Sequence, residues 1–293
     1  MQIQNLKVYC DLAETESFTK TAQINAVTQS AVSQTLTALE RTFKSLLVER
    51  TKKTFRLTRE GQVVYESSKE ILQTYAALDS KLLELKDIIS GSIRVATIYS
   101  IGLHDLPPYI KQFMQSHPTM NMHVEYRHAS QVYDDVLSNI VDLGLVAYPV
   151  KDAKLEIVPL HKDPLVLICH PQHPFAKLKG IKVKELANQK MVGSTQKEPT
   201  RNALDKILRQ NGVQAQYSME FDNVETVKRA VEIDGGVAIV PEVTVRQEVA
   251  QKSLAAVELE GGRLFRPLAA IHKKDRVLSP GMKQFLEVLK GAE

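Results

Sequence analysis

The chain has 293 residues, of which 43% are hydrophobic and 25% are charged. These values are ordinary for globular proteins, and the length is enough for two or three domains, each with its own buried core. No apolar run reaches the roughly 20 residues of a membrane-spanning helix, and Met1–Leu6 lacks the charged and apolar regions of a secretion signal. We therefore expect no membrane association and a protein that stays in the cytoplasm.

The two cysteines, Cys10 and Cys169, lie far apart in the sequence and form neither a CxxC motif nor a metal-ligand spacing. We interpret both as reduced, structural residues. The sequence predicts neither a metal site nor a cofactor.

Residues 22–40 predict a short helix, a tight turn and a longer helix. Four apolar positions of the longer helix, at steps of four, three and four, would form one buried stripe: Val32, Leu36, Leu39 and Phe43. Thr28 stands where an N-cap hydroxyl would open this helix and leave backbone donors for a phosphate. The opposite face is polar and suits base edges in a major groove; it consists of Gln29, Ser30, Ser33, Gln34, Thr37 and Arg41. Taken alone, this pattern also fits a surface helix of an ordinary three-helix domain.

The next segment is strongly basic. Residues 41–59 hold seven basic side chains against one acid, Glu49, a local balance of +6 in a chain whose net charge is +4. Basic charge concentrated beside a candidate reading helix is typical of phosphate contacts. The threonine-rich stretch 49–58 shows a rough alternation of side-chain polarity, which predicts a two-stranded wing. A solvated basic hairpin would have the same composition. Its candidate DNA contacts are Arg50, Lys52, Lys53 and Arg56.

Several short runs of this region occur in one order and spacing: Ser17-Phe18-Thr19, Ala22, Thr28–Ser33, Leu39-Glu40, Leu47–Arg50 and Leu57–Gly61. Together they resemble the winged helix-turn-helix of LysR-type transcriptional regulators. The chain departs from the family pattern at Thr21, where a second alanine is usual, at Thr42-Phe43, which replaces Leu-Gly, and at Ser30, where proline is common. The resemblance implies a regulator whose partners are double-stranded DNA, a small-molecule effector, further copies of itself as a homodimer or homotetramer, and RNA polymerase.

From Glu60 to Ser90 the pattern predicts one long helix, with Gly91 at its C′ position. Its apolar seam alternates steps of four and three and includes Val64, Ser68, Ile71, Tyr75, Leu78, Leu82, Leu85 and Ile89. Such a seam needs a covering surface, which could be the helix's own domain. The resemblance to the family implies instead a linker helix through which two subunits pair.

After Gly91, apolar strands alternate with amphipathic helices, which predicts two α/β lobes dominated by parallel strands. The expected strands are 93–98, 122–126, 143–147, 165–170, 217–221, 237–240 and 268–272; the expected helices lie near 106–115, 131–140, 200–210, 224–232 and 280–290. The resemblance implies that the last strand and helix return to the first lobe, with hinge crossings near 161–164 and 264–267.

The predicted fold class is therefore α/β: a winged helix-turn-helix (1–60), a linker helix (61–90) and an effector domain (91–293) like the periplasmic binding proteins. Lobe I would comprise residues 91–162 and 268–293, and lobe II residues 163–267.

Ligands of open α/β sheets usually lie beyond the carboxyl ends of strands, at helix starts. This geometry selects Thr97, Tyr99, Ser100, Ile101, Ala147, Tyr148, Ser194, Thr195, Gln196, Thr200, Arg201, Asn223 and Thr226. Hydroxyls and free backbone amides favour a polar or anionic ligand, and Arg201 could add charge. Serine and threonine at helix starts are equally well explained as simple caps.

An enzyme is the rival class, since α/β lobes also host catalysis. The sequence contains no GxGxxG, GK[ST], GxSxG or HExxH motif, so we predict that the chain is not an enzyme. A DNA-architectural protein without an effector is the remaining alternative.

Overall fold

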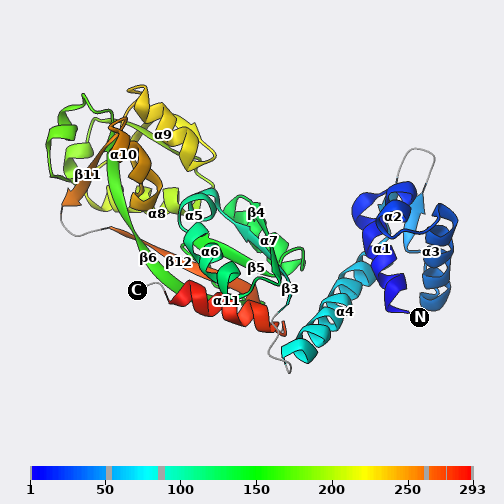
Figure 1. Cartoon of the computed structure of the whole chain (residues 1–293). Helices are drawn as coiled ribbons and strands as arrows, with labels where there is room; N and C mark the ends of the chain where they lie inside the picture. The colour runs from blue at the N-terminus through cyan, green and yellow to red at the C-terminus, as the bar shows by residue number, and fades with distance from the viewer. Residues whose placement is uncertain (1, 51–54, 85–89, 261–263, 275, 292–293) are drawn as a thin grey trace. The chain divides into compact units, whose positions relative to one another are not determined.

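A computed structural model describes residues 2–50, 55–84, 90–260, 264–274 and 276–291, with the backbone alone at 50, 76–77 and 79–84. The chain forms two compact units, Met1–Ile88 with Val277–Ser279, and Ile89–Arg276 with Pro280–Glu293. Figure 1 colours them from blue at the N-terminus to red at the C-terminus. The domain and lobe limits given above stay predictions.

The first unit is a helical domain with a small hairpin. Its elements are α1 (Ile3–Thr15), α2 (Phe18–Ile24), α3 (Gln29–Phe43), β1 (Val48–Arg50), β2 (Phe55–Leu57) and α4 (Arg59–Glu84). The predicted helix, turn and longer helix are thus confirmed as α2 and α3, and the predicted wing as the antiparallel pair β1–β2. The core includes Leu6, Tyr9, Leu12, Ala22, Val32, Leu36, Leu39 and Leu47.

The buried stripe of α3 is shorter than predicted. Val32, Leu36 and Leu39 are buried, but Phe43 is 39% exposed, so its predicted burial was wrong. The helix ends at Phe43, and Lys44 adopts a left-handed conformation with φ 52° that turns the chain. Phe43 therefore lies at the end of the stripe, where the core no longer covers it.

The seam of α4 has two parts. Ser68 is buried and Val64 packs against the core of its own unit. Ile71, Tyr75 and Leu78 are exposed by 43%, 47% and 51%. The remaining seam positions lie outside the described side chains: Leu82, Leu85 and Ile89.

The predicted C′ role of Gly91 stays a prediction, because residues 85–89 lie outside the described residues. Gly91 is the first residue of a strand, at φ 122°. Glycine tolerates this positive φ without strain, which explains the residue at that position.

The second unit is built on one long sheet. The strand order is β4-β3-β5-β12-β6-β11-β7, and β10 also pairs with β6. The strands are β3 (Gly91–Thr97), β4 (Met120–Tyr126), β5 (Leu143–Ala147), β6 (Leu155–Cys169), β7 (Gly180–Lys182), β10 (Ala238–Pro241), β11 (Ala255–Glu260) and β12 (Phe265–Lys273); β8 (Lys190–Ser194) and β9 (Gln216–Phe221) pair separately. The helices are α5 (Tyr99–His104), α6 (Pro107–Ser116), α7 (Ala129–Leu137), α8 (Pro199–Gln210), α9 (Val224–Glu232), α10 (Arg246–Gln251) and α11 (Pro280–Lys290), with 3₁₀ turns at Pro174–Lys177, Val183–Leu186 and Glu242–Val245.

Two long strands, β6 and β12, connect the lobes (Figure 1). They pair antiparallel, with Asp163 opposite Arg266 and Pro164 opposite Phe265. The two segments predicted to cross between the lobes, 161–164 and 264–267, therefore lie side by side, and their role as a hinge stays a prediction. We call the part with β3–β5, α5–α7 and α11 the first lobe, and the part with β7–β11 and α8–α10 the second lobe.

Parallel pairing occurs in both lobes. In the first lobe β3 runs parallel to β4 and β5. In the second lobe β8 runs parallel to β9 and β7 to β11, whereas β6 is antiparallel to both β10 and β11, so this lobe is mixed and is not dominated by parallel strands as predicted. Because β6 leads into the second lobe, the strands that pair with it there run back toward the first.

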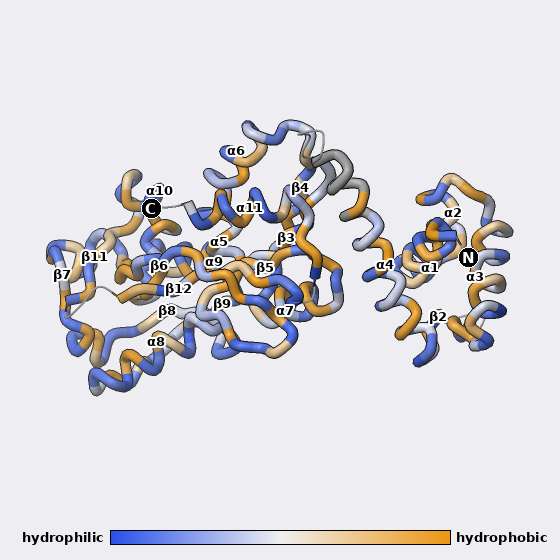
Figure 2. Tube along the Cα trace, turned by 90° about the horizontal axis from the view of Figure 1, so that it is seen from below, coloured by the Kyte–Doolittle hydropathy of each residue, from blue (hydrophilic) through white to orange (hydrophobic). Residues whose placement is uncertain are grey.

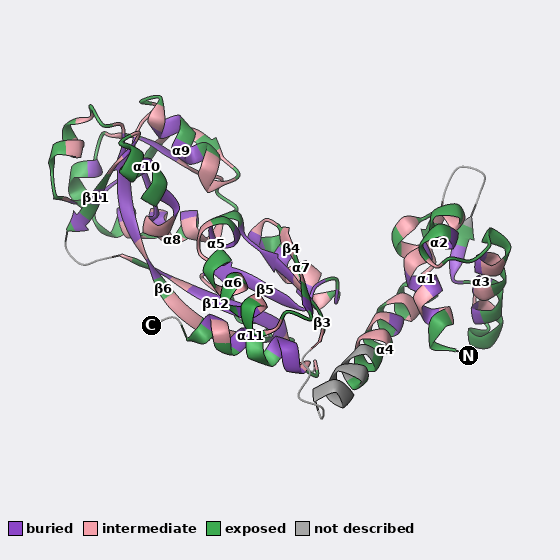
Figure 3. Ribbon diagram, viewed as in Figure 1, coloured by how far each residue is buried: buried purple, intermediate pink, exposed green. Residues whose placement is uncertain are grey.

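Burial explains why residues 165–169 of β6 are continuously apolar. Leu165, Leu167 and Cys169 contact one core cluster, whereas Val166 and Ile168 contact another. Alternate side chains of a strand face opposite ways, so a strand covered on both faces needs no polar positions. Figure 2 shows the apolar residues gathered along such strands, and Figure 3 shows the same strands buried while the helices keep exposed outer faces.

Both cysteines are buried and unpaired. Burial raises the pKa of Cys10 to about 12 and that of Cys169 to about 11. Each therefore stays a poorly reactive thiol near neutral pH. Within the described ranges, no helix has the length and apolar character that a membrane crossing needs.

Candidate DNA-reading surface and effector cavity

The polar face of α3 is exposed, and its side chains are available for contacts with another molecule. Gln29, Ser30, Gln34, Thr37 and Arg41 are exposed and Ser33 is half-buried. Among the described residues, none of these side chains has a hydrogen-bond or ion-pair partner within the chain. The Thr28 hydroxyl accepts a hydrogen bond from the Ala31 amide at 3.1 Å, which confirms the predicted N-cap. The helix thus presents free polar groups on one face while the opposite face anchors it in the core.

The wing is fixed to the rest of the unit by polar contacts at its base. The Leu47 amide donates to Glu40 at 3.0 Å, and the Thr58 hydroxyl donates to the Leu46 carbonyl at 2.6 Å. Gly61, in the first turn of α4, lies so close to Leu47 that a Cβ would collide with the Leu47 carbonyl oxygen. The wing is therefore held at a set position beside α3.

The basic residues of the wing are only partly described. Arg56 is exposed on β2, opposite Glu49 of β1. Lys52, Lys53 and the side chain of Arg50 lie outside the described residues.

A cavity of about 90 Å³ lies between the two lobes of the second unit. Its first-lobe lining is Ile98, Tyr99, Ser100, Arg127 and His128. Its second-lobe lining includes Met191–Ser194, Glu198, Thr200, Arg201, Leu204, Tyr217, Asp222–Val224, Val227 and Ile239–Pro241, and Arg266 of β12 completes it. The cavity therefore combines an apolar wall with a few polar groups, as small-molecule sites commonly do.

The structure brings together six of the residues predicted for the effector: Tyr99, Ser100, Ser194, Thr200, Arg201 and Asn223. The others lie outside the lining: Thr97, Ile101, Ala147, Tyr148, Thr195, Gln196 and Thr226. Thr97, Ile101 and Ala147 are almost fully buried in the first lobe. The Thr226 amide and hydroxyl both bond to Asn223, which makes Thr226 part of a helix cap.

Six charged or titratable residues of the lining were not predicted: Arg127, His128, Glu198, Tyr217, Asp222 and Arg266. Arg127, His128 and Asp222 directly follow β4 and β9, so the strand-end rule would have selected them if applied to every strand. Arg266 lies within β12, and only the pairing of that strand with β6 places it at the cavity.

Three helices begin at the cavity. The N-cap residues of α7, α8 and α9 are His128, Glu198 and Asn223, and all three line it. Glu198 makes no side-chain cap, so the first amides of α8 receive no acceptor from it. Helix N-termini carry partial positive charge and free donors, which favour an acceptor or an anion.

A buried ion pair lies where the crossing strands meet the cavity. Arg266 donates to Asp163 at 2.7 Å and to the Ser100 hydroxyl at 2.8 Å, and both charged residues are at most 3% exposed. Burial raises the pKa of Asp163, an effect that the Arg266 guanidinium opposes. Arg266 thus orients Ser100 toward the cavity and links it to β6.

Arg201 is held more tightly than a free ligand-binding group. It donates to Asp205 at 2.9 Å and to Glu220 at 2.7 Å, and its guanidinium lies 3.3 Å from the centre of the Tyr217 ring. Burial, followed by the hydrogen bond to Asp205, raises the pKa of Tyr217. Arg201 therefore shapes the second-lobe wall and brings little uncompensated charge.

Comparison with known proteins decides the family. A "LysR substrate binding domain" matches residues 86–293, and a "Bacterial regulatory helix-turn-helix protein, lysR family" domain matches residues 3–62. The chain belongs to the LysR family. It is a DNA-binding transcriptional regulator with an effector-binding domain, as the sequence predicted.

Relatives and solved structures agree along nearly the whole chain. The regulator CysL of Bacillus subtilis is 26% identical over 285 residues, covering 97% of this chain and 95% of CysL. A full-length variant of OxyR from Pseudomonas aeruginosa has a TM-score of 0.79 at 21% identity, covering 99% of this chain and 93% of that one. Full-length CbnR in complex with its target DNA has a TM-score of 0.71 at 19% identity, covering 99% of both chains. At these identities the solved structures show a shared fold.

Proposed function

We propose that α3 of this LysR-family regulator reads base edges in the major groove and that the wing contacts phosphates. The observation that carries the proposal is the polar face of α3, exposed and without partners in the described chain while the opposite face is buried. Glutamine and serine can donate to and accept from base edges, whereas Arg41 and Arg56 suit phosphates. The solved complex of CbnR with its target DNA supports the proposal.

The effector is a small molecule with a polar or anionic group, bound in the cavity between the lobes. Ser100 and the start of α8 offer donors to that group, and Val192, Val227 and Ile239 offer an apolar wall to the rest of the molecule. A ligand that contacts both lobes binds their closed arrangement best and shifts the equilibrium toward it. The effector thereby changes how the regulator holds or bends its promoter.

The effector assignment is tested by melting the full-length protein with small organic acids and polar metabolites, added one at a time. A ligand at 100 times its Kd adds about 2.7 kcal/mol of stability. Ser100→Ala should lose the response to a stabilising compound, because Ser100 lines the cavity. Thr195→Val is the matched control: Thr195 follows a strand in the same way but lies outside the lining, so its response should persist. A response unchanged in Ser100→Ala would place the effector elsewhere, and no response to any compound would favour an architectural protein.

The exposed row Ile71, Tyr75 and Leu78 of α4 is the surface through which two copies pair. Replacing Ile71 and Leu78 by lysine would bury like charges against each other in such a dimer. Sedimentation should then show monomers, and operator affinity should fall about 10²–10⁴-fold, since two linked readers bind far more tightly than one. Val63→Lys, also exposed on α4 but off the seam, should leave the dimer intact. Unchanged assembly in the double variant would mean that another surface holds the copies together.

The higher oligomeric state, the further partner, the location and the absence of catalysis are inferred from the family. Pairing of dimers into tetramers and contact with RNA polymerase are the interactions expected of a regulator that bends a promoter. Such a protein works in the cytoplasm, where bacterial promoters are, and we expect it to catalyse no reaction.

A further inference from the structure

The cavity between the lobes is surrounded by more negative than positive charge. Three arginines line it, and each is already paired with carboxylates: Arg127 with Glu125 and Asp135, Arg201 with Asp205 and Glu220, and Arg266 with Asp163. Glu198 and Asp222 add two further carboxylates to the lining itself. Because the carboxylates outnumber the guanidinium groups, a ligand that carries only negative charge would be repelled.

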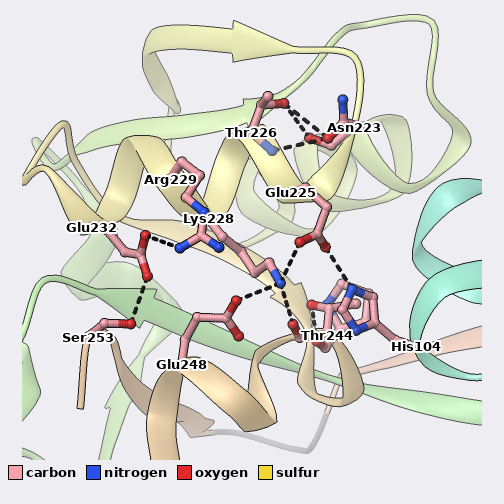
Figure 4. A network of polar contacts seen from close by, with 11 residues as sticks. His104, Asn223, Glu225, Thr226, Lys228, Arg229, Glu232, Thr244, Glu248 and Ser253 are labelled. Carbon is pink, nitrogen blue, oxygen red and sulfur yellow. Dashed lines mark hydrogen bonds and ion pairs between the residues drawn. The ribbon is translucent and has the colours of Figure 1, made fainter. Parts of the chain in front are cut away.

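The buried lysine behind the second-lobe wall is also committed to carboxylates. Lys228 follows Val227 of the lining on α9 and is 1% exposed. Its ammonium contacts Glu225 at 2.9 Å and Glu248 at 2.8 Å, and Figure 4 shows it between these two carboxylates. Glu225 is in addition hydrogen-bonded to the ring of His104 at 2.6 Å. Lys228 therefore leaves the negative surroundings of the cavity uncancelled.

Two lining carboxylates have neither a lysine nor an arginine as ion-pair partner among the described residues. Glu198 contacts the ring of His128 at 3.3 Å, and Asp222 accepts a hydrogen bond from the Asn223 amide group at 2.8 Å. A carboxylate can accept several hydrogen bonds, so each keeps acceptor capacity. Glu198 and Asp222 thus suit a positively charged group that carries N–H donors, such as an ammonium.

The same cavity offers hydrogen-bond donors that lack acceptors within the described chain. Ser100 is 8% exposed and its hydroxyl oxygen accepts from Arg266, which leaves the hydroxyl proton for another acceptor. The Thr200 amide lies in the first turn of the twelve-residue helix α8 and donates to no backbone carbonyl. Nε of Arg266 is buried and has no acceptor. Because buried donors without acceptors are unfavourable, the site favours a ligand with acceptor oxygens, such as a carboxylate.

The rest of the wall is aliphatic. Val192, Val227 and Ile239 are each at most 8% exposed, and all three line the cavity. The cavity volume of about 90 Å³ leaves room for a short side chain only. The site therefore combines acceptors for a cation, donors for an anion and a small apolar surface.

We propose that the effector is a small α-amino acid, bound as a zwitterion with a short aliphatic side chain. This inference rests on the proposed role of the cavity and names the chemical class of its ligand. The ammonium donates to Glu198 and Asp222, while the carboxylate accepts from Ser100 and from the Thr200 amide. A zwitterion has no net charge, so it satisfies the free donors without adding to the negative charge around the cavity. Ser100 belongs to the first lobe and the other three residues to the second, so the ligand joins the lobes.

The test compares matched ligands by titration calorimetry on the full-length protein. The amino acids are L-alanine and L-valine. Propanoate and isovalerate are the same molecules without the ammonium, and L-alaninamide and L-valinamide replace the carboxylate by an uncharged amide. At least one amino acid should bind, and both of its counterparts should bind at least about tenfold more weakly, because each loses one set of charged partners.

Two substitutions test the ammonium site directly. Glu198→Gln combined with Asp222→Asn removes both negative charges and keeps the side-chain shapes, so affinity for the amino acid should fall at least about tenfold. Affinity for the matching plain carboxylate should stay the same or rise, because repulsion is removed. Glu260→Gln, exposed on β11 and outside the lining, is the control for lost charge and should bind like the parent protein. If the double variant does not fold, each single variant should show the same change of preference to a smaller degree.

Three outcomes overturn the proposal: neither amino acid binds, a plain carboxylate binds as tightly as its amino acid, or the variants at Glu198 and Asp222 bind the amino acid like the parent protein. Failure of the effector assignment gives a different result. If the cavity is not the effector site, Ser100→Ala keeps the melting response to whichever compound stabilises the protein. If only the ligand class is wrong, Ser100→Ala loses the response to a compound that is not an amino acid.

Discussion

On the reading helix, side chains such as Gln29 and Gln34 are exposed and bind nothing else in the described chain, whereas at the cavity Ser100, Arg201 and Arg266 are buried and bound to neighbours. A reader of DNA needs free donors and acceptors, and the nucleic acid supplies their partners. A cavity between moving lobes needs polar groups held in place before the ligand arrives. Substitutions on α3 should therefore change binding without changing stability, and substitutions at the cavity should change stability itself.

The largest effect on stability is expected from Arg266→Met. Removing the guanidinium leaves Asp163 buried without its ion-pair partner, which typically costs about 3–5 kcal/mol. Chemical denaturation, followed through the transition of the second unit, measures this loss. Arg41→Ala, an exposed arginine on α3, should change stability by no more than about 0.5 kcal/mol. Equal losses in the two variants would remove the contrast between the two regions.

A smaller effect, on binding alone, is expected from Gln29→Ala or Ser33→Ala. Each should weaken the operator complex by about 1–3 kcal/mol and leave binding to random DNA nearly unchanged, because only base contacts carry sequence information. Fluorescence anisotropy with operator and scrambled duplexes at one salt concentration measures both. Equal losses on the two duplexes would show that α3 contacts phosphates instead of bases.

The smallest effect is expected from Arg56→Ala on the wing. It should weaken binding to every sequence, because a phosphate is present at every position of the duplex. The slope of log K against log salt should decrease by about 0.9 for each phosphate that a subunit no longer neutralises. The same anisotropy titration, repeated over a range of salt concentrations, provides the slope. A weakening confined to the operator, with an unchanged slope, would make Arg56 a base-reading residue.

The sequence alone was most informative where all residues of a site lie on one element and follow its periodicity. The core face of α3, its Thr28 cap and its polar face occupy consecutive turns of a single helix, so a period of 3.6 residues predicts all three. The order of strands and helices in the second unit could be predicted in the same way. Phe43 was misjudged because periodicity does not reveal where the neighbouring core ends. Strands β7, β8 and β11 were missed because short strands with polar positions carry a weak local signal.

Tertiary structure alone decided which charged groups meet. Asp163 and Arg266 become partners through the register of β6 with β12, and His104 meets Glu225 only because the two lobes lie face to face. Lys228 would pass for a surface residue of an amphipathic helix, yet it is buried beneath two carboxylates. Local patterns reflect the free energy of forming one element at a time. Contacts between residues more than a hundred positions apart depend on how the elements pack. Strand register and lobe geometry bring those side chains within hydrogen-bonding distance, and no property of either segment alone does so.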